Sequence, residues 1–90
     1  MRWRLIDQGH GEGAARLLET DGNRALVESS HPFPTGATLI GIDLETGVKY
    51  HVKVRHGRRE DEQWFRIEGR FLSLTKEQRA AVLAAVAPQG

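Results

Sequence analysis

The sequence predicts a mainly β domain, a small six-stranded antiparallel β-barrel with one C-terminal α-helix. Three observations indicate this class. Short apolar segments recur about every ten residues with turn-forming residues between them, as in small barrels. Residues 48–55 alternate strictly between apolar and polar side chains, which is the period of a β-strand with one buried face. A capped amphipathic segment, from about residue 75 to residue 87, follows the last strand.

The composition fits one domain that spans residues 1–90. Of these residues 39% are hydrophobic and 28% are charged, which is typical of a soluble globular domain. The chain has no cysteine, so disulfides and thiolate metal sites are excluded. No apolar run approaches the roughly 20 residues of a membrane span, and the N-terminus lacks the apolar core of a signal peptide. We therefore expect a cytoplasmic protein.

The first half of the chain is expected to hold a short strand, a hairpin and a loop. Residues 3–6 form the first strand. Residues 14–18 and 24–28 flank Thr20-Asp21-Gly22-Asn23, in which Asp-Gly and Gly-Asn favour a tight turn. Residues 29–36 are predicted to be a loop, because their two prolines cannot donate to a β-ladder.

A second hairpin is expected from residues 38–44 and 48–55. Gly47 lies in the turn between them and supplies the positive φ that such turns need. Val48, Tyr50, Val52 and Val54 should face the core. Residues 57–62 are predicted to be a charged loop tip. The last strand should cover residues 64–72, with one apolar face formed by Phe65, Ile67, Gly69 and Phe71.

The helix has clear signals at both ends. Thr75 is a natural N-cap, and Gln78 three residues later completes a capping box. Pro88 is expected to end the helix. A helix this short is unstable alone, so Val82, Leu83 and Val86, which share one side, are expected to dock over an open end of the barrel.

Three segments resemble the PilZ domain, a bacterial β-barrel module that senses cyclic di-GMP. Residues 19–28 resemble the family's (D/N)-x-S-x-x-G segment and the strand after it. His31-Pro32-Phe33-Pro34-Thr35-Gly36-Ala37 resembles the loop that follows, and residues 66–79 resemble the closing strand and capped helix. The matching order spans about residues 14 to 86. The resemblance implies a regulatory domain with a protein partner in motility, attachment or signalling machinery, and cyclic di-GMP as a candidate ligand.

The chain departs from the residues that bind cyclic di-GMP in this family. Glu19, Asp21 and Arg24 stand at the Asp/Asn, Ser and final Gly positions. The upstream arginines are two residues apart, whereas the family's R-x-x-x-R pair is four apart. Two guanidiniums can clamp phosphates bidentately, whereas a carboxylate at position 21 would repel a dianion. We therefore predict a degenerate or lost site, and the candidate nucleotide-binding residues are Arg2, Arg4, Asp21, Asn23 and Arg24.

Simpler structural roles compete with this assignment. Asp21-Gly22-Asn23 is most simply a turn. Arg2 and Arg4 either clamp a phosphate beside a stacking Trp3 or face solvent while Trp3 packs inward. The second arrangement is favoured.

Basic side chains on the outward faces of two predicted strands suggest a partner surface. They are His51, Lys53, Arg55, Arg58, Arg59, Arg66 and Arg70. Nearby acidic residues would partly neutralise this face, so a solvated surface of mixed charge is the alternative. Trp64 either contacts a partner among these charges or covers the barrel beneath the charged loop. The candidate partner-binding residues are Trp64, Arg66, Arg70 and Arg55.

No residue pattern indicates an enzyme. The four histidines show no ligand spacing with one another, so neither a metal nor a cofactor is expected. Ser29 and Ser30 lie beside His31, but no carboxylate that could orient the imidazole is at a useful spacing. The first hypothesis is thus a non-enzymatic regulatory module. The alternatives are a true cyclic di-GMP receptor with an altered motif, and a small barrel that binds RNA or single-stranded nucleic acid through Trp64 and Trp3. A net charge of only +1 argues against nucleic acid.

Overall fold

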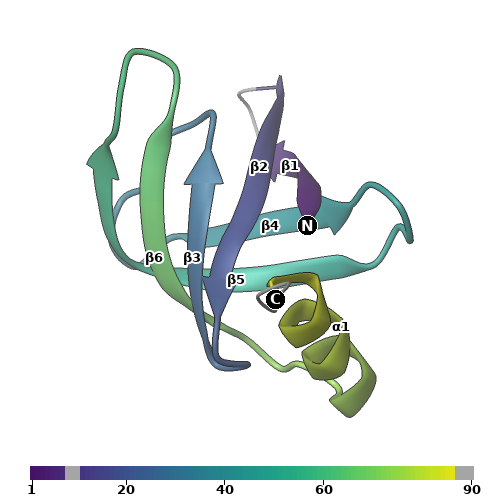
Figure 1. Ribbon diagram of the computed structural model, residues 1–90. Helices are drawn as coiled ribbons and strands as arrows, with labels where there is room; N and C mark the ends of the chain where they lie inside the picture. The colour runs from purple at the N-terminus through teal and green to yellow at the C-terminus, as the bar shows by residue number, and fades with distance from the viewer. Residues whose placement is uncertain (8–10, 87–90) are drawn as a thin grey trace.

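The computed structural model describes residues 1–7 and 11–86, and in this part the chain forms a closed β-barrel with one helix (Figure 1). The mainly β barrel with a C-terminal helix is therefore confirmed. The elements are β1 (Arg2–Asp7), β2 (Gly11–Thr20), β3 (Arg24–Ser29), β4 (Thr38–Asp43), β5 (Lys49–Arg59), β6 (Phe65–Phe71) and α1 (Lys76–Val86).

All neighbouring strands are antiparallel, in the order β1-β2-β3-β6-β5-β4, and β4 pairs with β1 to close the barrel. Four pairs join consecutive strands (β1 with β2, β2 with β3, β4 with β5, β5 with β6), while β3 with β6 and β1 with β4 join distant segments. The last strand thus lies between β3 and β5, and it aligns the side chains of these three strands across one wall.

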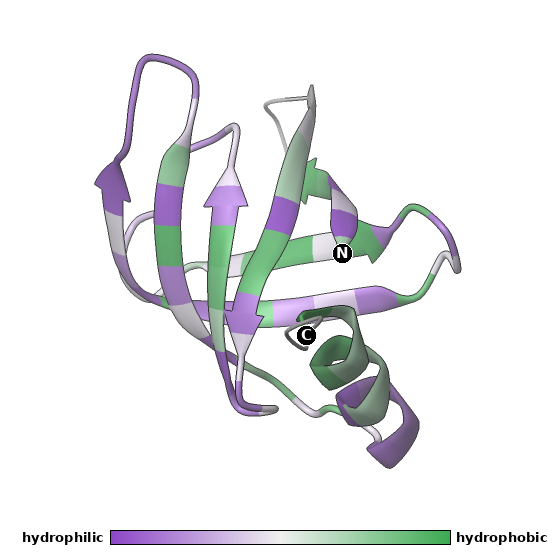
Figure 2. Ribbon diagram, in the orientation of Figure 1, coloured by the Kyte–Doolittle hydropathy of each residue, from purple (hydrophilic) through white to green (hydrophobic). Residues whose placement is uncertain are grey.

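The interior is filled by the apolar side of each strand. Hydrophobic and hydrophilic bands alternate along β6 (Figure 2), as expected when successive side chains point to opposite faces. The predicted inward residues of β5 are confirmed, since Tyr50, Val52 and Val54 are buried. The buried apolar core consists of Trp3, Leu5, Ala15, Leu17, Ala25, Val27, Leu39, Tyr50, Val52, Val54, Ile67, Phe71 and Val82.

An aromatic cluster lies within this core. Trp3 stacks on Tyr50 with ring centroids 5.6 Å apart, and both rings meet Phe71 edge-on at 6.1 Å. Gly41 makes room for the indole, because a Cβ there would lie 2.5 Å from Trp3 Cε3. Trp3 is only 1% exposed, which confirms that it packs inward and does not stack on a surface ligand.

The helix covers the end of the barrel where β2 turns into β3 (Figure 1). The capping box is confirmed: Gln78 N donates to Thr75 Oγ1 and Thr75 N donates to Gln78 Oε1, both at 3.0 Å. Of the predicted docking face, Val82 is fully buried and Val86 packs against the core, but Leu83 remains 39% exposed. Pro88 lies outside the described residues.

One predicted boundary is wrong. Gly57, Arg58 and Arg59 belong to β5 and not to a loop tip, because Arg58 pairs with Arg66 and Arg59 with Phe65. The turn itself is shorter and is held by Asp61, whose Oδ1 accepts from Gln63 N and Trp64 N at 2.8 and 2.9 Å. The long hairpin therefore projects its charged turn beyond the other strands (Figure 1).

Candidate functional site: a basic groove on β5 and β6

Three cations lie side by side across the wall formed by β3, β6 and β5. Arg70 is opposite Arg24 on one side and opposite Lys53 on the other. Directly opposite residues of antiparallel strands have Cβ atoms about 4.5–5.5 Å apart, and like charges at this spacing destabilise the pair. We call Arg24, Arg70 and Lys53 the cation row. All three residues are exposed.

A β-bulge adds a fourth cation beside the row. Val54 is opposite Gly69 and His56 is opposite Glu68, so Arg55 is the extra residue in β5. Bulges commonly redirect a side chain in this way. Gly69 permits the close approach of the strands, because a Cβ there would lie 2.5 Å from Lys53 O and 2.6 Å from Val52 Cγ1. The result is an exposed Arg55 two residues beyond Lys53.

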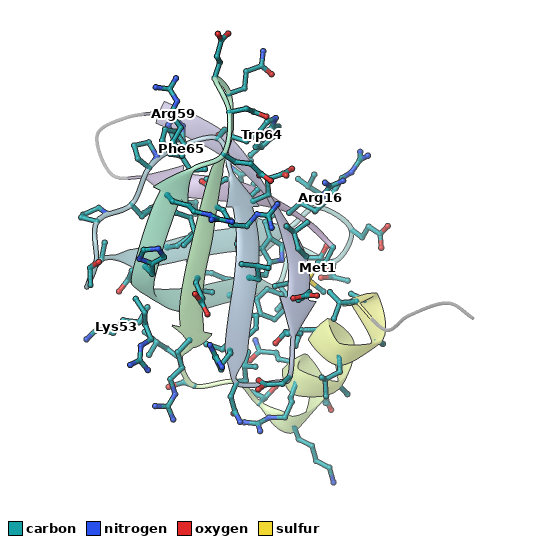
Figure 3. The ribbon with its side chains drawn as sticks, turned by 60° about the vertical axis from the view of Figure 1, so that its left-hand side comes forward. Met1, Arg16, Lys53, Arg59, Trp64 and Phe65 are labelled. Carbon is teal, nitrogen blue, oxygen red and sulfur yellow. The ribbon has the colours of Figure 1, made fainter. Side chains whose placement is uncertain are left out.

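Most of this positive charge is uncompensated. Arg24 Nη2 forms an ion pair with Glu68 Oε1 at 2.8 Å. Lys53, Arg55 and Arg70 form no ion pair with any other residue in the described part of the chain. These unpaired cations lie on the middle of β5, where Figure 3 labels Lys53, and on the adjacent part of β6.

These cations line a hollow of about 630 Å³, which we call the basic groove. Its floor includes Val54 and Phe71, and its rim includes the exposed apolar side chain of Leu72. Ser73, also at the rim, has a φ of 54°, a left-handed conformation that is uncommon for residues other than glycine. The lining residues are Thr35, Gly36, Lys53, Val54, Arg55, Arg70, Phe71, Leu72 and Ser73.

The candidate nucleotide-binding residues do not gather at one place. Arg2 pairs with Arg16 and Arg4 with Ala14 on β1 and β2. The β2–β3 turn begins four residues after Arg16, which is about 13 Å along an extended strand. Asp21, Asn23 and Arg24 do lie together in that turn, but Arg2 and Arg4 are not beside them.

The turn also uses its own carboxylate internally. Asp21 Oδ1 accepts from Arg24 N at 2.8 Å and from Asn23 N at 2.9 Å, which fits the simple turn interpretation. These hydrogen bonds, with that from Arg24 the stronger, hold the pKa of the Asp21 carboxyl below its ordinary value. A hollow of about 490 Å³ beside the turn is lined by Glu19, Asp21 and Glu68 against Arg24. Its carboxylates outnumber its cation, so it is poorly suited to a dianionic ligand.

The candidate partner-binding residues divide into two groups. Arg55 and Arg70 line the basic groove. Trp64 lies at the opposite end of β6 (Figure 3), and Arg66, four residues before Arg70, lies near it. Trp64 is half-buried, and Arg66 donates from Nη2 to Glu60 while its buried Nε has no partner in the described structure. The Trp64 end is therefore partly neutralised by acidic groups, unlike the groove.

The serines near His31 have structural contacts. Ser29 is fully buried, and its Oγ donates to His31 O at 2.7 Å and accepts from His31 N at 3.1 Å. Neither contact involves the imidazole. Within residues 1–7 and 11–86, no group of three or more His, Asp or Glu side chains is arranged to hold a metal ion. The single helix described is too short and polar to cross a membrane.

Sequence reasoning found Arg55 and Arg70 but missed what completes the groove. The sequence places Lys53 only in a broad basic face, and it assigns Thr35, Leu72 and Ser73 to a loop, a strand and the segment before the helix without a binding role. The bulge and the strand register bring these residues together, and neither has a local sequence signature. Comparison with known protein families, curated proteins and solved structures finds no match to this chain.

Proposed function

We propose that this domain is a non-enzymatic, PilZ-like regulatory module of a bacterial cytoplasmic protein, and that it acts by binding another protein through the basic groove. The supporting observation is the cation row with Arg55, in which three cations lack an ion-pair partner within the described residues. Like charges in opposite positions destabilise the free domain, and a negatively charged partner would relieve their repulsion. The PilZ resemblance suggests that the partner belongs to motility, attachment or signalling machinery.

Cyclic di-GMP binding is degenerate or lost in this proposal. Arg2 and Arg4 lie apart from the β2–β3 turn, and the turn is surrounded by carboxylates. Isothermal titration with cyclic di-GMP, with GTP as the control, should therefore give no heat and no shift in melting temperature. A dissociation constant of about 1 µM or tighter for the cyclic dinucleotide alone would instead make the domain a receptor with an altered motif. Binding that survived Arg2→Ala with Arg4→Ala would move that site elsewhere.

The partner contact is tested by charge reversal in the groove. The triple variant Lys53→Glu, Arg55→Glu and Arg70→Glu is used as bait beside the wild type in a quantitative pull-down from the source cells. The control reverses three exposed cations outside the groove, Lys49→Glu, Arg58→Glu and Lys76→Glu, and has the same net charge. We expect a partner that the wild type and the control retain and the groove variant loses. Equal capture by all three baits would contradict the proposal.

A further inference from the structure

We infer that the basic groove holds an extended acidic segment of the partner protein, in which carboxylates at alternate positions meet Lys53, Arg55 and Arg70 while an apolar side chain covers Leu72. This inference rests on the proposed function and specifies the chemistry of the partner. It is favoured over an ordinary mixed-charge surface, because Arg70 lies between two like charges and the cations Lys53, Arg55 and Arg70 line one hollow.

The contrast between two rows of side chains supports this assignment. Arg16 is opposite Glu28, and their ion pair is 3.2 Å long; Arg66, next in register, is paired with Glu60. In the cation row, Arg70 has only cations opposite it. In the first row the arginines of β2 and β6 are thus paired with carboxylates, although Arg58 of β5 lies opposite Arg66. In the cation row, Lys53 and Arg70 form no ion pair within the described residues and line the hollow.

The spacing of the cations suits an extended chain. Lys53 and Arg55 are two positions apart on β5, and alternate side chains of an extended peptide are about 6.6 Å apart on one side. Arg70 lies opposite Lys53 on the adjacent strand. Carboxylates at alternate positions of the bound segment can therefore reach neighbouring cations, and arginine can hold a carboxylate bidentately.

The apolar part of the groove favours peptide over nucleic acid. Leu72 is 39% exposed at the rim, which suits an aliphatic side chain placed between acidic ones. The one aromatic residue of the lining, Phe71, is 7% exposed and packs in the core, so it offers no face on which a base could stack.

Titration with charge-matched probes tests whether the basic groove binds an acidic peptide or a nucleic acid. A fluorescently labelled short peptide of alternating Glu and Leu is titrated with the whole domain at low salt, and binding is followed by anisotropy. The comparison probes are a peptide of alternating Gln and Leu and an oligothymidylate with the same charge as the acidic peptide. We expect the acidic peptide alone to bind, with a dissociation constant of about 10–100 µM. Lys53→Gln, Arg55→Gln and Arg70→Gln together should weaken it at least about tenfold. Lys49→Gln, Arg58→Gln and Lys76→Gln together should leave the affinity for the acidic peptide unchanged.

The other outcomes separate this inference from the proposed function. Absence of peptide binding, with partner capture still lost in the groove variant, overturns the acidic segment and keeps the protein contact. Absence of both overturns both. Tighter binding of the oligothymidylate would make the groove a nucleic-acid site. Concentration-dependent dimerisation that disappears in the groove variant would assign the groove to the acidic turn of a second copy, residues 60–62, and would overturn a separate partner.

Discussion

At the residue scale, Gly69 determines how closely β5 and β6 approach. Gly69→Ala would place a methyl group 2.5 Å from Lys53 O, against backbone that cannot move without opening the bulge. We expect a loss of about 1–3 kcal/mol in the free energy of unfolding, measured by urea denaturation. Gly36→Ala is the comparison. A Cβ at position 36 meets no atom within 4 Å, so any loss of stability there comes from the positive φ of 92° and not from a steric clash. A Gly69→Ala domain as stable as the wild type would contradict the steric account.

Asp21 gives the domain a predictable response to acid. Its pKa is lowered in the folded state by backbone hydrogen bonds from Arg24 and Asn23, so the carboxylate stabilises the fold above its ordinary pKa of 3.8. That contribution is lost as pH falls through the lower folded value. Melting temperature measured between about pH 5 and 2 should show this loss in the wild type, and Asp21→Ala should melt lower at neutral pH and lack it. Asp21→Asn, which keeps an acceptor oxygen, should fall between them at neutral pH.

At the element scale, α1 depends on its N-terminal cap. Val82 is its one fully buried residue, so the helix has a small docking area and relies on the reciprocal Thr75–Gln78 hydrogen bonds. Thr75→Ala should lower the free energy of unfolding by about 1 kcal/mol, measured by urea denaturation followed by circular dichroism. Thr75→Ser keeps the hydroxyl and should retain most of the stability. An Ala variant equal to the Ser variant would mean that the cap contributes little.

The elements also show how far the sequence could predict the molecule. Alternation over residues 48–54 predicted the core side of β5, because a period of two reports burial directly. The alternation stops after Arg55, because the bulge shifts the register of the strand by one residue, and so the pattern predicts a strand that ends at Arg55. The cation row was beyond prediction because it depends on the register of β3, β6 and β5, and each of its residues alone resembles an ordinary surface cation.

At the scale of the whole molecule, a net charge of +1 hides an uneven distribution. The acidic turn at residues 60–62 and the cation row lie at opposite ends of β6. Arg70→Gln should therefore leave the free energy of unfolding unchanged or raise it by up to about 1 kcal/mol at low salt. It removes the repulsion between Arg70 and the two cations opposite it, Arg24 and Lys53. The difference should vanish near 1 M salt, where the screening length is about 3 Å. Arg16→Gln, which breaks an ion pair with Glu28, should bring no such gain in thermal melts at either salt concentration.

The position of β6 between β3 and β5 also shapes how the chain reaches its native state. Until residues 65–71 are in place, both neighbouring strands expose unpaired backbone edges, and such edges invite pairing with other chains. Joining β3 to β6 requires closing a long loop, so we expect folding in milliseconds to seconds, slow for a domain of this size. During synthesis the incomplete barrel therefore remains prone to aggregation until β6 has been made. Charged side chains beside the unpaired edges, above all those of the long strand β5, oppose pairing with other chains.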